Sequence, residues 1–330
     1  ACVSGQLNDH QDRKSNNAYK VRVMQDGPHQ SEYYGYERSC PDAEDIFPCV
    51  CTYYSASNTL DLECSSVESE EQLKQIFKAD FPFKNFREFK VQGNNNLKVL
   101  EAGIFNGISF ERIDIGNNNL EIIELQALDS CYEVTTAIFL KSNRITSFPF
   151  DELSHFSQLN HFDIGRNSLS VIPTDAFNGL TALDYLDISN NYAKIVGAFQ
   201  DLPNLQTIDL SYNNVTAVPV NFIKTGSSDL TYIYMWGNNI SSVEPGAFDM
   251  VDSLYITMED NSLSTLGEAT WRPYLEVGGK IFAAGNPLIC DCDIAWLFGE
   301  DQLLEGVSET TACNDGVHLH DLDPSIFDPC

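Results

Sequence analysis

The sequence predicts an α/β repeat protein, a solenoid whose short parallel strands form one long concave sheet between two disulfide-bonded caps. Three observations support this fold class. A motif of apolar residues that ends in asparagine recurs at a mean spacing of 24 residues. Eight of the ten cysteines fall into two groups of four, one near each end of the repeats. The 330-residue chain is 43% hydrophobic and 20% charged, which is enough apolar material for an extended repeat array.

The repeated frame is LxxLxLxxNxL, seen for example in Leu205, Ile208, Leu210, Asn213 and Val215. This spacing is typical of leucine-rich repeats. Alternation along a strand places the LxL pair in the core and the intervening residues on the opposite face. The asparagine amide is expected to satisfy backbone groups of neighbouring units. The asparagines that end the nine units are Asn94, Asn118, Asn143, Asn167, Asn191, Asn213, Asn238, Asn261 and Asn286.

The return segments of the repeats carry a second apolar column, made of phenylalanines. Because one unit cannot bury its own core, the array must stack and needs capped ends. Three units depart from the frame: Thr135 and Ser253 replace the first leucine, and Leu97 is displaced by one residue. We expect altered geometry there and no missing unit. The phenylalanine column consists of Phe105, Phe177, Phe199, Phe222 and Phe248.

The two cysteine groups predict disulfide-bonded caps formed in an oxidising compartment. A zinc site at Cys290-Asp-Cys292 is the alternative, although the CxxC spacing of zinc sites is absent. Cys2 and Cys131 stand apart from both groups, and we predict an internal bridge between them, with bonds to another chain as the alternative. The groups are Cys40, Cys49, Cys51 and Cys64 near the start, and Cys290, Cys292, Cys313 and Cys330 at the end.

These features divide the chain into four parts. Residues 1–39 are a polar arm outside the repeats, and residues 40–85 are the N-terminal cysteine cap with its lead-in. Residues 86–285 are the leucine-rich repeats, and residues 286–330 are the C-terminal cysteine cap.

The charge of the chain limits its partners. The net charge is −29, and residues 1–39 hold equal numbers of acidic and basic side chains, so the excess lies in residues 40–330. Such a surface disfavours nucleic acid and anionic lipid, and no apolar run has the roughly 18 residues of a membrane span. Sequons at Asn214 and Asn239 predict N-glycosylation and agree with a secreted, extracellular protein.

No catalytic motif for hydrolysis, phosphate binding or dinucleotide binding occurs in the sequence, so we predict neither catalytic residues nor a cofactor. In HLHD, His318 and His320 are the best metal candidates, but we interpret them as part of a polar loop in the cap and predict no metal site.

Asp163, Asp187 and Asp209 share one outward strand position in successive units. We interpret this column as a contact for a basic partner, with a solvated face, calcium or acid–base chemistry as alternatives.

An aromatic group decorates the same face in later units. If Ile233 and Met235 point inward, their neighbours point outward together, and an exposed apolar patch of this size marks an interaction site. Tyrosine and tryptophan are favoured interface anchors, so we predict partner binding here. The alternative is that the arm or the C-terminal cap covers the rings. The predicted patch contains Tyr212, Tyr232, Tyr234, Trp236 and Tyr255, with Phe282 on the last strand.

The convex segments and caps resemble one crustacean family. SEEQLKQIF, FPFDEL, VTAVPVNFIKTGSSDL, SVEPGAFD, LGEATWRPYLE and HLHDLDPSIF look like the non-catalytic leucine-rich-repeat subunits of deep-sea shrimp luciferase, over roughly residues 40–330. The resemblance implies a non-catalytic protein that supports a small catalytic luciferase subunit in a hetero-oligomer, with no catalytic residue carried over. The alternative is a secreted recognition protein of haemolymph or matrix that binds a protein or glycan, and an enzyme with an acidic site is a third class.

The caps also resemble those that flank leucine-rich repeats. CPDAEDIFPCVC with LDLEC is similar to an N-terminal cap, and NPLICDCDIAWL is similar to a C-terminal cap. The pairing usual in such caps, first with third and second with fourth, implies the bridges Cys40–Cys51, Cys49–Cys64, Cys290–Cys313 and Cys292–Cys330.

Overall fold

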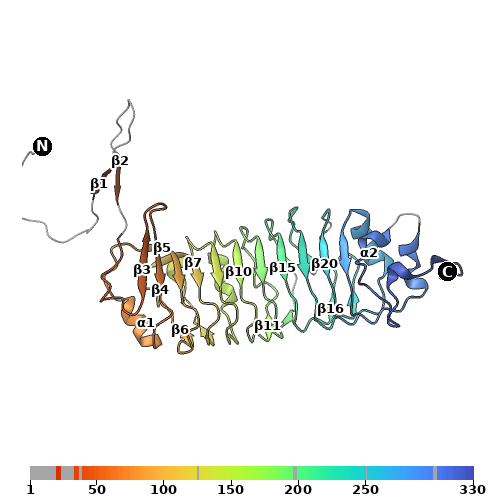
Figure 1. Ribbon diagram of the computed structural model, residues 1–330, viewed down its shortest axis with the longest axis horizontal. Coiled ribbons are helices and arrows are strands. Elements are labelled where there is room, and N and C mark those ends of the chain that lie inside the picture. Colours follow the sequence, from red (N-terminus) through yellow and green to blue (C-terminus); the bar gives the residue numbers. More distant parts are fainter. Residues whose placement is uncertain are drawn as a thin grey trace, which may run out of the picture.

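The structure is a computed structural model that describes residues 39–124, 126–195, 199–249, 251–299 and 303–330, and the backbone of two short strands at 20–23 and 33–36. The main part is a solenoid with one eleven-stranded sheet along its length, whose strands follow one another in chain order (Figure 1). All neighbouring strands of this sheet are parallel except β3 and β4, which form an antiparallel hairpin in the N-terminal cap. The predicted fold class is confirmed.

Each of the nine predicted repeats contributes one strand to this sheet, from β5 to β21. The hairpin of the cap adds the other two strands. The sheet consists of β3 (Val50–Tyr54), β4 (Thr59–Glu63), β5 (Asn85–Lys90), β7 (Ser109–Asp114), β9 (Ala137–Phe139), β10 (His161–Asp163), β12 (Tyr185–Asp187), β15 (Thr207–Asp209), β18 (Tyr232–Tyr234), β20 (Tyr255–Thr257) and β21 (Lys280–Phe282).

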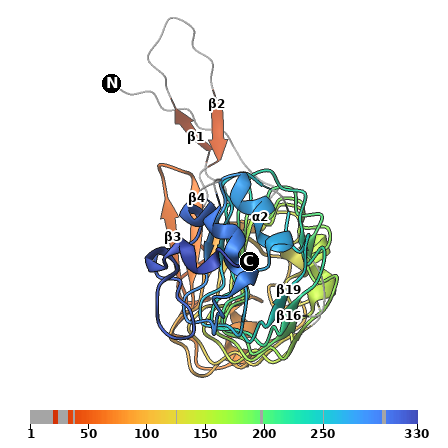
Figure 2. The same ribbon diagram turned by 90° about the vertical axis from the view of Figure 1, so that its right-hand side faces the viewer.

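The opposite side of the solenoid is irregular and carries short parallel strand pairs, 3-10 turns and two α-helices. Seen along its long axis, the molecule shows successive coils overlying one another, with α2 and the C-terminal cap toward the viewer (Figure 2). The pairs are β6 (Val99–Leu100) with β8 (Ile122–Ile123), β11 (Val171–Ile172) with β13 (Lys194–Ile195), β14 (Phe199–Gln200) with β17 (Ile223–Lys224), and β16 (Ala217–Val218) with β19 (Ser242–Val243). The helices are α1 (Glu70–Ile76), α2 (Glu268–Glu276), and the 3-10 helices η1 (Asp129–Cys131), η2 (Phe150–His155), η3 (Cys292–Phe298), η4 (Leu303–Gly306), η5 (Leu319–Asp321) and η6 (Pro324–Phe327).

The core fills the space between the sheet and the return segments as the repeat frame predicts. In β18, Ile233 is fully buried, as is Met235 after it, while Tyr232 on the other side of the strand is exposed. All five members of the phenylalanine column are buried, and the Phe199 ring contacts Phe177 and Phe222, with centroid distances of 5.7 and 5.9 Å. Successive units therefore share one continuous apolar interior.

The repeat asparagines connect each unit to the one before it. The Nδ2 of Asn191 donates hydrogen bonds to the carbonyl oxygens of Ile164 and Ile188 at 3.0 Å and of Ser189 at 3.1 Å, and its Oδ1 accepts from the amide of Leu169. Asn167 and Asn213 repeat this arrangement one unit away on either side. The backbone groups left unpaired where each strand turns out of the sheet are thus satisfied by side chains.

The units that depart from the frame are changed locally, as expected. Thr135 stays buried because its Oγ1 donates a 2.6 Å hydrogen bond to the carbonyl oxygen of Phe110. Ser253 adopts φ +60°, and Leu254 occupies the core in its place. The displaced Leu97 is buried, and its amide donates to Oδ1 of Asn94 at 3.1 Å.

Four disulfides close the two caps. In the N-terminal cap the β3–β4 hairpin is followed by α1, whose first turn is capped by the Ser69 hydroxyl accepting from the amide of Gln72 at 3.2 Å. The bridges are Cys40–Cys51, Cys49–Cys64, Cys290–Cys313 and Cys292–Cys330, which is the pairing implied by the resemblance of the caps.

The predicted Cys2–Cys131 bridge is wrong in this structure. Cys131 carries a free thiol that is fully buried at the end of η1, where it is covered by the core, and Cys2 lies outside the described residues.

Of the arm at residues 1–39, the structure describes only a two-stranded antiparallel pair, β1 (Lys20–Val23) with β2 (Tyr33–Tyr36), and residue 39. In the part of the chain that is described, no helix is long and apolar enough to cross a membrane.

We predict that Asn191→Ala lowers the free energy of unfolding by about 1–3 kcal/mol per backbone group left without a partner, as expected for buried polar groups. Thermal and urea unfolding followed by circular dichroism would measure the loss. Asn178→Ala is the matched control, because Asn178 is exposed. Equal stability of the two variants would contradict a structural role for the asparagine ladder.

We predict that the Cys131 thiol resists alkylation in the folded protein and reacts once the chain is denatured without reduction. Burial raises the pKa of this thiol to about 11, so little thiolate forms at neutral pH. Peptide mapping after iodoacetamide treatment checks both states. A Cys131 that stays unlabelled in denaturant until a reductant is added would show that it is disulfide-bonded.

Candidate functional site

The solvent face of the long sheet is ordered in rows that run across the strands, because neighbouring units are paired in register. Asp163 pairs with Asp187 and Asp187 with Asp209, which confirms that the three carboxylates form a column. The row continues to Tyr234 in the next strand. The acidic column and the aromatic patch are therefore consecutive parts of one surface.

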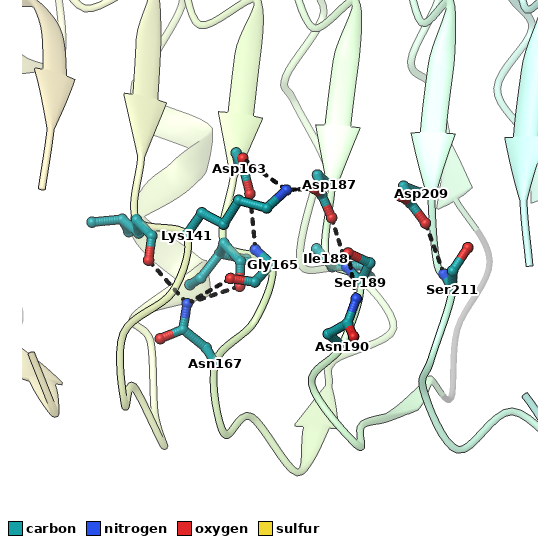
Figure 3. A network of polar contacts seen from close by, with 12 residues as sticks. Lys141, Asp163, Gly165, Asn167, Asp187, Ile188, Ser189, Asn190, Asp209 and Ser211 are labelled. Carbon is teal, nitrogen blue, oxygen red and sulfur yellow. Dashed lines mark hydrogen bonds and ion pairs between the residues drawn. The ribbon is translucent and has the colours of Figure 1, made fainter. Parts of the chain in front are cut away.

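Most carboxylates of the acidic column bind other groups of the protein, which differs from the contact for a basic partner that the sequence predicted. Each of the three carboxylates accepts a hydrogen bond from the backbone amide two residues later, at 2.8–3.0 Å (Figure 3). Lys141 Nζ lies 2.6 Å from Oδ2 of Asp187 and 3.6 Å from Oδ2 of Asp163. Asp163 and Asp187 are 7% and 1% exposed, so they are not available to a basic partner in the way that their outward positions suggested.

Burial also changes the protonation of this column. Desolvation, with the charge of Asp187 as a second cause, raises the pKa of Asp163 to about 6. Desolvation raises the pKa of Asp209 as well. Asp209 differs from its neighbours because no ion pair of the described residues includes it, and Figure 3 shows it bonded to Ser211 alone.

The predicted aromatic residues come together over β15, β18 and β20. Tyr232 and Tyr234 stack with their centroids 5.7 Å apart, and Tyr255 lies 5.3 Å from Tyr232 across the next strand. Tyr212 meets Trp236 edge to face at 4.5 Å. We call these five residues the aromatic patch. Phe282 extends it onto β21, 6.3 Å from Tyr255.

A glycine fixes the position of one of these rings. Gly237 has φ +66°, and a Cβ at this residue would lie 2.6 Å from ring carbons of Tyr212. The Tyr212 ring therefore lies directly on the backbone of the next unit. The hollow beside it, bordered by Asn190 and Tyr192, measures about 180 Å³, which is below the roughly 300 Å³ usual for small-molecule sites.

No described part of the chain covers the aromatic patch. Tyr212, Tyr232 and Trp236 are 43%, 37% and 36% exposed, while Tyr234 and Tyr255 are half-buried by their neighbours. The C-terminal cap thus leaves the rings accessible. The alternative that side chains of the arm cover these rings concerns residues that lie outside the described part of the chain.

A second aromatic group on the same face was missed from the sequence. His161 stacks on Tyr185 at 4.3 Å and contacts Phe139 at 4.6 Å, and the Arg112 guanidinium lies 3.8 Å from the centroid of Phe139. Arg112 also binds Glu88 at 2.8 Å. These residues occupy the outward strand positions that identified the aromatic patch, so applying the same alternation to earlier units would have found them.

Glu259 is another residue that the sequence did not single out. It follows β20 on the row of Trp236, since the amide of Gly237 donates to the carbonyl oxygen of Glu259 at 2.9 Å. Its Oε2 is buried and accepts no hydrogen bond, and desolvation raises the pKa of the side chain.

The remaining candidates are at the edges of this surface or away from it. The sequon residues Asn214 and Asn239 are both exposed, at equivalent positions just after the repeat asparagines. His318 and His320 each contact a backbone carbonyl within the C-terminal cap, at 2.8 and 2.9 Å. No group of three or more potential metal ligands comes together among the described residues.

Comparison with known proteins adds family information to this geometry. The leucine rich repeat family model matches residues 134–192, 157–215 and 203–263. The non-catalytic subunit of Oplophorus-luciferin 2-monooxygenase from Oplophorus gracilirostris is 30% identical over 315 residues, which cover 88% of this chain and 87% of that protein.

More distant similarities concern repeat proteins of other kinds. Toll-like receptor 3 from Boselaphus tragocamelus is 25% identical over 212 residues, covering 59% of this chain and 23% of the receptor. Among solved structures, a crystal structure of a TLR13–ssRNA13 complex superposes with a TM-score of 0.57 and 24% identity, covering 67% of this chain and 31% of that one. At this identity the likeness shows the fold alone.

We predict that His161→Phe makes the protein progressively more stable than the wild type as the pH falls from about 7.5 to about 5. Burial, and then the charge of Arg112, lowers the pKa of His161 to about 4 from its ordinary 6.5. Between pH 6.5 and about 4, His161 binds a proton in the unfolded chain but stays neutral in the folded protein. The free energy of unfolding of the wild type therefore falls as the pH drops through this window. Phenylalanine keeps the stacked ring and removes the titration.

Scanning calorimetry of both proteins at several pH values measures this difference. Asp163 is present in both, so its opposite dependence on pH cancels. His155→Phe is the matched control at an exposed histidine. A melting-temperature difference for His161→Phe that does not change with pH would contradict the assignment.

Proposed function

Because the chain belongs to the leucine-rich-repeat family of the Oplophorus-luciferin 2-monooxygenase non-catalytic subunit, we propose that it is a secreted, non-catalytic binding subunit that holds a small catalytic luciferase chain. In this proposal the aromatic patch of the long sheet is the docking surface. The catalytic chain carries out the chemistry, and this protein supplies a rigid platform.

The exposure of the aromatic patch is the observation that carries the proposal. Three of its rings are more than a third exposed although each is in contact with another ring of the patch, and soluble proteins seldom leave such a group in water. Large aromatic side chains dominate the binding energy of protein interfaces. The rings also rest on a sheet whose register is fixed, so little ordering is needed when a partner binds.

The other features are consistent with this role. Four disulfides favour an oxidising compartment, which supports secretion. Asn214 and Asn239 lie one residue past the repeat asparagines Asn213 and Asn238. Glycans there would border the aromatic patch without covering it.

The proposal is tested by the native mass of the protein isolated from its source. A complex with one or more small chains is expected, and luciferase activity should fractionate with it. A lone monomer would contradict the subunit role. A stable complex that lacks luciferase activity would instead favour a recognition protein of haemolymph or matrix.

We predict that Trp236→Ala weakens binding of the co-purifying chain by about 2 kcal/mol or more, roughly 30-fold, as is usual for a central aromatic anchor. Surface plasmon resonance with the purified components measures the change. Val171→Ala removes an exposed apolar side chain from β11, on the opposite side of the solenoid, and should leave the affinity unchanged. Equal affinities for the two variants would remove the aromatic patch from the interface.

A further inference from the structure

The two halves of the sheet face differ in how their charges are balanced. In the N-terminal half several carboxylates of the sheet face lie beside a basic side chain of the protein, as Asp163 and Asp187 lie beside Lys141. In the C-terminal half, Asp209 and Glu259 take part in no ion pair of the described residues. The carboxylates beside the aromatic patch are therefore left without an ion-pair partner among the described residues.

Twice in the N-terminal half, the protein itself combines an aromatic ring, a carboxylate and an arginine on this sheet. Arg112 lies 3.8 Å from the centroid of Phe139 while its Nε lies 2.8 Å from Oε1 of Glu88. Arg87 lies 4.7 Å from the centroid of Tyr54, and its Nε donates to Asp61 at 2.8 Å. A guanidinium can stack on a ring and bind a carboxylate at once, because its donors lie in the plane of the stacked group.

The aromatic patch offers the same ring and carboxylate without the arginine. Asp209 pairs in register with Tyr234, on one side of β18. Glu259 lies level with Trp236 on the other side of β18, two strands from Asp209 and two residues further along the strand direction, so their backbones are roughly 12 Å apart. Asp209 is thus beside Tyr234 and Glu259 beside Trp236, on opposite sides of β18.

The environment of the flanking groups agrees with a missing cation. Oε2 of Glu259 is buried and has no hydrogen-bond donor. After desolvation and the neighbouring Tyr232, the charge of Asp209 is a further cause of the raised pKa of Tyr234, so the hydroxyl and the carboxylate are close enough to interact. A basic group here would form an ion pair with carboxylates that have none among the described residues.

We propose that the aromatic patch is built to receive an arginine side chain of a partner protein, stacked on Tyr234 and Trp236 and paired with Asp209 or Glu259. This inference rests on the proposed docking function and adds the chemistry that the partner must present. Arginine fits better than lysine because the guanidinium is flat and less strongly hydrated, so it can lie against a ring and still reach a carboxylate. The charge of −29 favours approach of such a basic segment.

The probe for this inference is a short soluble peptide with three arginines, compared with peptides of the same length that carry citrulline or lysine. Binding is followed by isothermal titration calorimetry at low salt. The arginine peptide should bind at least about tenfold more tightly than the citrulline peptide, and raising the salt to about 0.5 M should weaken it. Equal binding of the arginine and citrulline peptides would overturn the inference.

Two isosteric substitutions locate the site. Asp209→Asn together with Glu259→Gln should weaken the arginine peptide by about tenfold or more, since it removes both flanking charges. The asparagine can still accept the hydrogen bond from Ser211, so the fold is expected to persist, and circular dichroism verifies this. Asp175→Asn together with Asp252→Asn changes two exposed carboxylates outside the patch and is the control for net charge. Unchanged affinity in the double variant with an intact fold would place the peptide elsewhere and overturn the inference.

The outcome is separable from that of the proposed function. If Trp236→Ala releases the co-purifying chain but the double variant retains it, the docking surface stands and the arginine site is wrong. If the native protein is a lone monomer but the arginine peptide binds in a manner that depends on Asp209 and Glu259, the arginine site stands and the luciferase role is wrong.

Discussion

The hydrogen bonds of the repeat asparagines are the constraint on which the rest of the structure depends. Where each strand leaves the sheet, one amide serves carbonyl groups of its own unit and of the preceding unit, and its oxygen accepts from the preceding backbone. Because this arrangement is repeated from unit to unit, the chain turns out of the sheet at the equivalent residue in each unit. The apolar side chains then stack into a continuous core, and the strands pair without slipping.

Fixed register turns the outward positions of the strands into a surface that is ordered in two dimensions. Neighbouring units place Asp163, Asp187, Asp209 and Tyr234 in one line, so a change from acidic to aromatic character in the sequence becomes a boundary in space. On one side of this boundary Lys141 and Arg112 neutralise the carboxylates within the protein. On the other side, exposed rings adjoin the half-buried carboxylates of Asp209 and Glu259, which have no ion pair among the described residues. The binding properties of the face thus follow from where the chain supplies its own cations and where it does not.

The sequence was sufficient for the fold because its signals are periodic. Nine asparagines fix nine units, and the alternation in Ile233 and Met235 identifies which neighbours face outward. The acidic column was predicted, but its burial was not. Lys141 follows a strand in an earlier unit, and its reach across two neighbouring strands depends on side-chain conformation, which no spacing encodes. The pairing of Cys131 could not be predicted either, because counting cysteines does not reveal that this sulfur is enclosed by the core.

The contact between Tyr212 and Gly237 has a consequence for how this surface can diverge among relatives. An outward residue that contacts no neighbouring unit can be exchanged by itself. The Tyr212 ring, however, occupies the space that any side chain at residue 237 would need. A larger residue there would have to be accompanied by a smaller one at 212, so the two units can only vary together. This part of the aromatic patch is therefore built from two consecutive repeats, and replacing either repeat alone would disrupt it.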